Sequence, residues 1–298
     1  MADIAVSVLA KLKNKARESR ISYQQCLQLF FQEEFLRKLA ASKYSENFVL
    51  KGGLFIYTLT NFKSRATVDV DFLMQGLNHD LNLMDDIIAE VLAVPTGNDF
   101  IIFNASKTAP IALQRKYHGV STQITGSIKN VRLPFCIDIG VGDVIIPESK
   151  KRSIQTQLEG YEHPKILTYS LESTIAEKLD AILQRLELTG RMKDFYDIYY
   201  LSCMFDFEGL KLQTAIQETL QNRGTSYEQN SFERILALAE DEVMHTRWRY
   251  FLRTLGNEDI PFSTIIHGMD LFLKPIWHDL LLEKEFQCNW TASEMKWK

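Results

Sequence analysis

Residues 67–74 have the sequence TVDVDFLM, in which polar and apolar side chains alternate. In a β-strand alternate side chains share a face, so we expect Asp69 and Asp71 side by side on one face. Val68 and Val70 are predicted to point to the core. Strands disfavour Asp, and two like charges this close repel each other. A bound cation would account for the pair, and an exposed strand face with accidental acids is the alternative.

A third carboxylate is predicted on a neighbouring strand. In the apolar stretch FCIDIG, residues 135–140, Asp138 faces away from the isoleucines on either side of it. Carboxylate oxygens are the ligands that Mg²⁺ prefers. Two such ions can hold the attacking and leaving oxygens of a displacement at phosphorus, and Asp138 could take the proton of an attacking hydroxyl. Asp143 follows in a Gly-rich turn and is either close to this site or simply a turn residue.

A glycine pair lies upstream of the carboxylates, in the stretch VLKGGLFIYTL. Without a Cβ atom, a turn at Lys51-Gly52-Gly53 lets backbone N–H groups approach a ligand. We expect residues 54–61 to be helical, and the N-terminus of a helix attracts phosphate. A purely structural turn is the alternative, because a single glycine pair is weak evidence.

The composition indicates an ordinary soluble protein. The chain has 298 residues, a net charge of −4 and 46% hydrophobic residues, which argues against disorder and against a general nucleic-acid coat. No apolar run reaches the roughly 18 residues that a membrane helix needs, so no membrane partner is expected. Four widely spaced cysteines indicate reduced thiols and a cytoplasmic protein.

Two domains are predicted. Residues 1–160 form a carboxylate-bearing domain with a small mixed sheet and flanking helices, and residues 161–298 form an all-helical domain that closes the active-site cleft. The fold class is therefore α+β with a helical C-terminal domain. The polar residues 147–165 are expected to be a linker, in which the basic run 150–152 either is solvated or contacts RNA.

The helical half carries two further candidates. Residues 171–188 place apolar side chains along one stripe, with Lys178 off its centre. The stretch RMKDFYDIYYLSCMF follows as a second helix, on which Asp194 and Asp197 are three residues apart and share a face.

Five motifs in this order and spacing resemble the AbiEii/AbiGii nucleotidyltransferase toxin family: LKGG (50–53), RATVDVD (65–71), IDIGVGD (137–143), STIAEKLDA (173–181) and RMKDFYDIY (191–199). The resemblance covers about residues 20 to 205. This family belongs to the nucleotidyltransferase superfamily of the DNA polymerase β type. Its members are commonly toxins of toxin–antitoxin and phage-abortive-infection systems, and the related MenT toxins transfer nucleotides to tRNA.

The resemblance implies a role for each matching residue. Gly52 and Gly53, with Lys51 before them, would hold the triphosphate. Many superfamily members have Gly-Ser at this point. Because this chain has a second glycine in place of the serine, it lacks a phosphate-binding hydroxyl, and backbone N–H groups must bind the phosphate instead. The implied metal ligands are Asp69, Asp71 and Asp138; the implied phosphate contacts are Arg65 and Lys178; and Asp194 would complete the catalytic set. Two alternatives stay open: Arg65 pairs with an acid, and Lys178 ties the helical domain to the strands through an ion pair.

The implied activity is transfer of a nucleotide from an NTP to an acceptor hydroxyl, with release of pyrophosphate and with Mg²⁺, or Mn²⁺ in its place. RNA, and tRNA in particular, is the favoured acceptor. The resemblance also implies the toxin of a type IV AbiE-like toxin–antitoxin or phage-abortive-infection system, with an antitoxin encoded nearby. The alternatives are a phosphotransferase that modifies protein hydroxyls and a catalytically inactive NTP-binding regulatory module.

Overall fold

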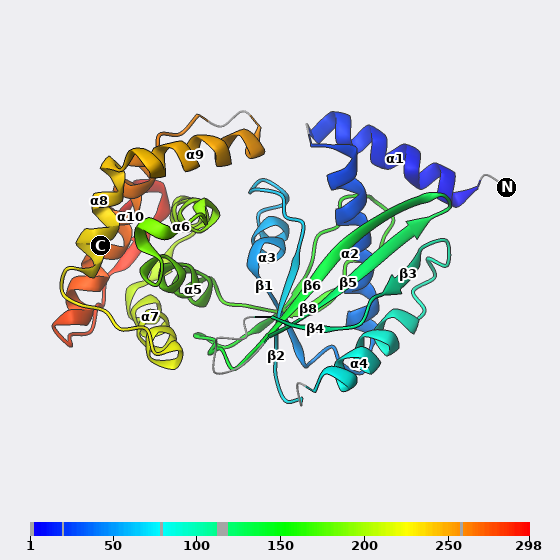
Figure 1. The fold of residues 1–298 in the computed structure, drawn as a ribbon, viewed down its shortest axis with the longest axis horizontal. Helices are drawn as coiled ribbons and strands as arrows, with labels where there is room; N and C mark the ends of the chain where they lie inside the picture. The colour runs from blue at the N-terminus through cyan, green and yellow to red at the C-terminus, as the bar shows by residue number, and fades with distance from the viewer. Residues whose placement is uncertain (1–2, 20, 78–79, 112–118, 257–258) are drawn as a thin grey trace. The chain divides into compact units, whose positions relative to one another are not determined.

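The computed structural model describes residues 3–19, 21–77, 80–111, 119–256 and 259–298 (Figure 1). The chain divides into two compact units, which are described separately. Unit 1 comprises Met1–Gly142 and Ser149–Tyr169, and unit 2 comprises Asp143–Glu148 and Ser170–Lys298. Unit 1 continues past the expected boundary at residue 160 because the strand β8 (Lys165–Thr168) pairs with its sheet.

Unit 1 is built on a mixed sheet. Within the described residues its strand order is β3-β5-β6-β2-β1-β8-β7, and β4 pairs with β5. The strands are β1 (Phe48–Lys51), β2 (Val70–Met74), β3 (Ile102–Ala105), β4 (Ala109–Ile111), β5 (Gly119–Ile128), β6 (Val131–Val141), β7 (Lys150–Ser153) and β8. The pairs β2·β6 and β1·β8 are parallel and the other pairs are antiparallel. The predicted mixed sheet is therefore confirmed.

Four helices accompany this sheet in the described part of unit 1: α1 (Ile4–Ser19), α2 (Tyr23–Ala41), α3 (Gly52–Leu59) and α4 (Leu81–Ala93). A capping box starts α2, in which the Ser22 hydroxyl accepts the N–H of Gln25 and the Gln25 side chain accepts the N–H of Ser22. The aromatic side chains Phe30, Phe31 and Phe35 of α2 are at most 2% exposed, so this part of α2 belongs to the core.

The expected linker is partly a strand. The basic residues 150–152 lie in β7, which pairs with β8 at the edge of the sheet. There Arg152 donates to the hydroxyl of Thr168 and, at 3.2 Å, to the carbonyl oxygen of Tyr169. Lysines are common on edge strands because their charge discourages pairing with other chains. The basic run is thus part of an edge strand, which its polar composition alone did not indicate.

Unit 2 is predominantly helical, as predicted. Its α-helices in the described residues are α5 (Leu171–Leu183), α6 (Met192–Met204), α7 (Gly209–Arg223), α8 (Ser231–Ala237), α9 (Glu242–Leu255) and α10 (Phe262–Leu281). It also contains a small antiparallel sheet of β9 (Phe207–Glu208), β10 (Asn289–Thr291) and β11 (Lys296–Trp297), which the sequence did not indicate. Strands of two or three residues are too short to show an alternating pattern.

Aromatic packing holds this small sheet to the helices. The rings of Trp290 and Phe272 have centroids 4.9 Å apart, and Trp297 stacks on Phe272 at 5.7 Å. Among the described helices of both units, none is long and apolar enough to cross a membrane.

Candidate active site

Four polar residues occupy neighbouring strands of unit 1 at one level. Ser121 of β5 pairs with Asp138 of β6, Asp138 pairs with Asp71 of β2, and Asp71 pairs with Lys51 of β1. Side chains that are directly opposite in adjacent strands share a face of the sheet. We call these four residues the carboxylate row. The structure therefore brings together Asp71 and Asp138, which are 67 positions apart in the sequence.

The other face of these strands is the core. Phe72, Ile137 and Ile139 have exposed fractions of 0%, so the predicted alternation holds for residues 70–72 of β2 and 135–140 of β6, whereas Leu73, on the same face as Asp71, is also 0% exposed. The expectation that Val68 points to the core was wrong, because β2 begins only at Val70 and Val68 is 56% exposed. The backbone of Val68 is nevertheless fixed, since its carbonyl oxygen accepts two side-chain hydrogen bonds of 2.7 Å from glutamines of α2.

The glycine pair lies directly against the carboxylates. Gly52 has φ +70°, and a Cβ atom built on it would be 2.1 Å from Oδ2 of Asp71. A Cβ atom on Gly53 would be 2.8 Å from the hydroxyl of Thr67 and 3.4 Å from Nη2 of Arg65. Glycine is required at Gly52 for its backbone angle and at both positions for space. These contacts place the glycine turn, Arg65 and Asp71 in one site.

The helix α3 starts at this turn, at Gly52 itself, two residues earlier than expected. Lys51 is its N-cap residue and provides no side-chain cap. The first N–H groups of a helix have no partner within the helix, and the helix dipole adds partial positive charge there. The turn is anchored because Leu54, Phe55 and Ile56 are at most 1% exposed. An N-terminus of this kind can bind phosphate.

Two residues of the site were missed at the sequence level. The hydroxyl of Ser121 donates a 2.6 Å hydrogen bond to Oδ1 of Asp138 and orients that carboxylate. Cys136 lies two residues before Asp138, on the same face of β6. Its pKa is raised first by burial and then by the charges of Asp69 and Asp138, which indicates that both carboxylates are close to the thiol. The strand register that brings these residues together has no local sequence pattern.

The carboxylates fit a magnesium ion that binds together with a nucleotide. In the described ranges, no three His, Cys, Asp or Glu side chains form a group that could hold a metal ion by themselves. Mg²⁺ is usually bound through one or two carboxylates and completes its shell with water and substrate phosphate. Asp71 and Asp138, paired in register beside the glycine turn, offer the oxygen donors for such an ion, and Asp69 lies one residue before β2.

Lys178 and Asp194 belong to unit 2, where they form a buried ion-pair cluster. Nζ of Lys178 is 3.2 Å from Oδ1 of Asp194 and 2.6 Å from Oδ2 of Asp197. Lys178 is 9% exposed and both aspartates are at most 1% exposed. These ion pairs join α5 to α6 within unit 2.

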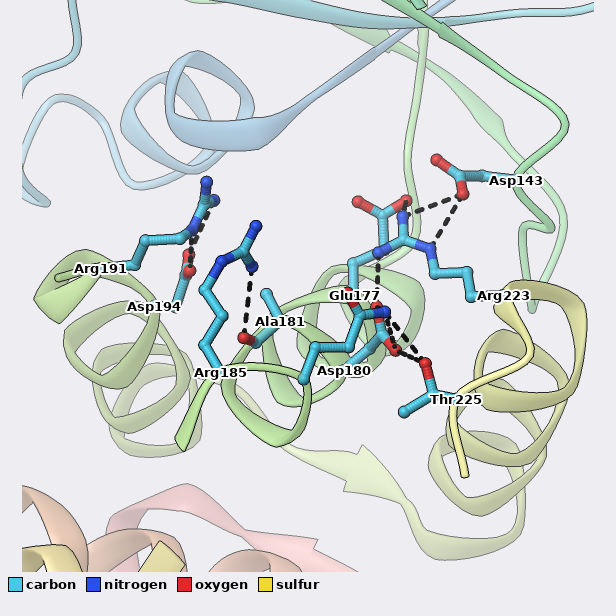
Figure 2. Close-up of polar contacts among 10 residues, drawn as sticks. Asp143, Glu177, Asp180, Ala181, Arg185, Arg191, Asp194, Arg223 and Thr225 are labelled. Carbon is cyan, nitrogen blue, oxygen red and sulfur yellow. Dashed lines mark hydrogen bonds and ion pairs between the residues drawn. The ribbon is translucent and has the colours of Figure 1, made fainter. Parts of the chain in front are cut away.

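Arg191 completes this cluster. Its Nε atom is 2.5 Å from Oδ2 of Asp194 (Figure 2). Burial by itself raises the pKa of Asp194, but the charges of Lys178 and Arg191 and their hydrogen bonds outweigh it and hold the pKa at about 2. Asp194 is therefore ionised at neutral pH and fixes both cations in place.

Asp143 lies in a second cluster of unit 2, centred on Arg223. The guanidinium contacts Asp143 at 2.9 Å, Glu177 at 3.0 Å and Asp180 at 2.9 Å (Figure 2). Burial lowers the pKa of Arg223, and these three carboxylates together raise it above its ordinary value. Asp143 is thus more than a bare turn residue, since it pairs with an arginine 80 positions further along the chain.

This mixed sheet, with strand carboxylates set against a glycine turn at a helix N-terminus, defines a nucleotidyltransferase. The comparison with known families agrees. The model of the family described as nucleotidyl transferase AbiEii toxin, type IV toxin–antitoxin system, matches residues 34–268. The chain belongs to this family, and it is an enzyme of the nucleotidyltransferase class.

Solved structures share the fold at low sequence identity. The nucleotidyltransferase toxin MenT4 from Mycobacterium tuberculosis is 15% identical with a TM-score of 0.55, and the match covers 93% of this chain and 99% of that one. The protein JHP933 from Helicobacter pylori is 15% identical with a TM-score of 0.52, covering 88% and 95%. No curated protein matches the chain in a sequence search.

Proposed function

We propose that this protein transfers a nucleotide from an NTP to a hydroxyl group of RNA, with tRNA as the favoured acceptor, and releases pyrophosphate. The observation that carries the proposal is the contact between Gly52 and Asp71, with Asp138 paired in register beside Asp71. It sets a phosphate-binding turn against two carboxylates. The family supports a nucleotidyltransferase toxin, and the RNA acceptor and Mg²⁺ dependence are the parts that we add.

Different residues of the chain bind the phosphates and accept the proton. The N–H groups at Gly52 and Gly53, together with Arg65 and Lys51, bind and orient the triphosphate. In the transfer, the acceptor oxygen forms a bond to the α-phosphorus and the bond from that phosphorus to the bridging oxygen of pyrophosphate breaks. The hydroxyl proton passes to Asp138. We assign it to Oδ2, because Oδ1 accepts the hydrogen bond of Ser121.

Asp69, Asp71 and Asp138 would hold Mg²⁺, which neutralises phosphate charge and favours the attacking oxygen when bound. The family resemblance assigns Lys178 to offsetting charge on the departing pyrophosphate, and within unit 2 Asp194 holds the lysine in position. Three carboxylates close together disfavour a bare triphosphate. The transfer is therefore expected to require a divalent cation, and Mn²⁺ can replace Mg²⁺.

A labelling assay tests the proposal. The purified protein is incubated with Mg²⁺, total bacterial RNA and each α-labelled NTP in turn, beside a D69A/D71A variant and a sample with EDTA. We expect label from one NTP in a tRNA-sized band, and no label in the variant or with EDTA. Label in a protein band would favour the protein-modifying alternative. NTP binding without any transfer would favour the inactive regulatory module.

The toxin role has its own test. Induced expression in a bacterial host is expected to arrest growth with the wild type but not with D69A/D71A. Co-expression of the protein encoded by an adjacent antitoxin gene should restore growth. Equal growth arrest by the wild type and the variant would separate the toxicity from nucleotide transfer and contradict the proposal.

A further inference from the structure

The four residues Lys178, Arg191, Asp194 and Asp197 form ion pairs at the start of α6, and their charges balance. Lys178 and Arg191 supply two positive charges, and Asp194 and Asp197 supply two negative charges. A neutral cluster is well suited to fixing the geometry of its members, but it gives little net attraction for an anion. Any excess positive charge at this place must come from a neighbouring residue.

Arg185 is that neighbour. It directly follows the C-cap residue of α5, seven residues after Lys178. Its Nη1 atom donates a long hydrogen bond of 3.4 Å to the carbonyl oxygen of Ala181, one turn back toward Lys178. Figure 2 shows the side chains of Arg185 and Arg191 extending to the same side of unit 2.

The bonding of Arg185 differs from that of the other arginines around it. Arg223 is surrounded by three carboxylates, and Arg191 is paired with Asp194. Among the residues that the structure describes, Arg185 has no carboxylate within ion-pair distance, although it is partly buried. Its five N–H donors are therefore largely available to an external acceptor.

A further arginine braces the loop that carries these groups. Nη1 of Arg247 in α9 donates to the carbonyl oxygens of Glu187 and Thr189, at 2.8 and 2.9 Å. The loop between Arg185 and Arg191 is thus fixed by the hydrogen bonds of a residue almost sixty positions away. When a loop is already fixed by hydrogen bonds, less conformational entropy is lost as its side chains bind a ligand.

From this geometry we propose that Arg185 binds a phosphate group of the substrate, next to Lys178 and Arg191. The inference rests on the proposed function and deepens it by adding a substrate-binding residue. The planar guanidinium fits phosphate with two parallel hydrogen bonds, and Arg185 gives the cluster a net charge of +1. The phosphate is either part of the NTP or part of the RNA backbone, and the experiment separates the two.

The test compares R185Q and R185K with the wild type and with R234Q. Arg234 makes an exposed ion pair of 3.5 Å with Glu187, so R234Q removes the same charge from the same unit without touching the proposed contact. Initial rates are measured with NTP varied at saturating RNA and with RNA varied at saturating NTP. The free energy of unfolding is measured for each variant as a control for folding.

R185Q is expected to raise one KM by about tenfold or more, with a smaller effect on kcat, because a charge-assisted hydrogen bond is lost. A rise in the KM for NTP assigns Arg185 to the triphosphate, and a rise in the KM for RNA assigns it to the RNA backbone. R185K should recover part of the loss as a point charge, and R234Q should match the wild type. Unchanged KM values in an active R185Q enzyme would overturn the proposal.

Failure of the proposed function would look different, because the wild type itself would then transfer nothing. In that case the binding of tripolyphosphate and of tRNA is measured directly for the wild type and R185Q. Weaker binding of either ligand to R185Q would still support a phosphate site at Arg185. Equal binding, or no binding by either protein, would refute it.

Discussion

The carboxylate row of unit 1 and the Arg223 cluster of unit 2 use the same side chains in opposite ways. In the Arg223 cluster, three carboxylates surround one guanidinium, and Asp180 is 0% exposed. In the row, Asp71 and Asp138 are strand neighbours on a partly exposed face, beside a glycine turn. In the first arrangement the carboxylates surround a guanidinium, whereas in the second they lie beside a turn whose backbone N–H groups suit a phosphate.

The comparison shows that the number of acids does not distinguish a binding site from a structural ion pair. Asp143 lies within the IDIGVGD motif, only five residues after Asp138, yet it belongs to the structural cluster. The surroundings of each carboxylate decide its use. The four predictions below change these surroundings one at a time, beginning with the largest expected effect.

The largest effect is expected at Asp71 of the carboxylate row and at Asp69, which lies one residue before β2. D69A/D71A should lower the rate of nucleotide transfer by roughly 10³-fold or more, because the variant loses its metal-binding oxygens. Its free energy of unfolding should not fall, since the change also removes two like charges that lie close together. The rate of label transfer and urea unfolding are measured on the same preparation. A variant that retains a tenth of the activity would show that the row is not the catalytic site.

In the Arg223 cluster the large effect is expected on stability. R223Q removes the guanidinium and leaves the buried carboxylate of Asp180 without its cation, which should cost about 3–5 kcal/mol of unfolding free energy. R234Q breaks an exposed pair and should cost less than about 1 kcal/mol. Urea unfolding of both variants beside the wild type gives the comparison. Equal costs for the two variants would contradict a structural role for Arg223.

The glycine turn is tested by a matched pair of alanine substitutions. Gly52 and Gly97 both have positive φ, at +70° and +79°, but only Gly52 has an atom within 4 Å of its Cβ position. G97A should cost about 1 kcal/mol for the backbone angle alone. G52A should cost about 2–3 kcal/mol and should also lower nucleotide transfer by roughly 10²-fold, because Asp71 is displaced. Similar losses for the two variants would argue against the close approach.

The smallest effect concerns Glu33 of α2, a buried carboxylate that lies outside both of these clusters. Its Oε1 atom accepts the N–H of Gln157 at 2.7 Å, and its Oε2 atom accepts no hydrogen bond among the described residues. Burial raises its pKa to about 8, from an ordinary value of 4.5. Between these values the unfolded chain has released a proton that the folded chain keeps, so stability falls as the pH rises through this window.

The E33Q variant resembles the protonated glutamate and should remove that pH dependence. We expect the wild type to lose roughly 1–2 kcal/mol more unfolding free energy than E33Q between pH 6 and pH 8. Below about pH 4.5 the two proteins should converge, because the side chain is then protonated in both states. Urea unfolding at several pH values measures the difference, and parallel pH profiles would show that Glu33 titrates normally.

Local patterns in the sequence were sufficient for some of these features. The alternation in TVDVDFLM and FCIDIG placed the carboxylates on the face opposite to Phe72 and Ile137, and the glycine pair indicated the turn. The local patterns did not predict which of these segments pair with each other. The register of β2 against β6, the contact of Gly52 with Asp71 and the hydrogen bond from Ser121 all depend on pairing between distant segments.

The same limit explains the errors and omissions. Val68 continues an alternating pattern, but the strand starts after it, and hydrogen bonds from α2 to its backbone decide its position. Arg223 and Asp143 are too far apart in sequence for any local motif to link them. The polar composition of residues 150–152 suggested a linker. An edge strand with one exposed side also tolerates lysine, so composition does not distinguish the two.

The central claim is that the carboxylate row transfers the nucleotide and not the terminal phosphate. It is tested most directly by giving the wild-type protein one NTP labelled at the α-phosphate and, in a parallel reaction, the same NTP labelled at the γ-phosphate, with RNA and Mg²⁺ in both. We predict that only the α-label enters RNA, and that the γ-label is released as pyrophosphate in equal amount. Entry of the γ-label into any acceptor, with the α-label left on a diphosphate, would contradict the account.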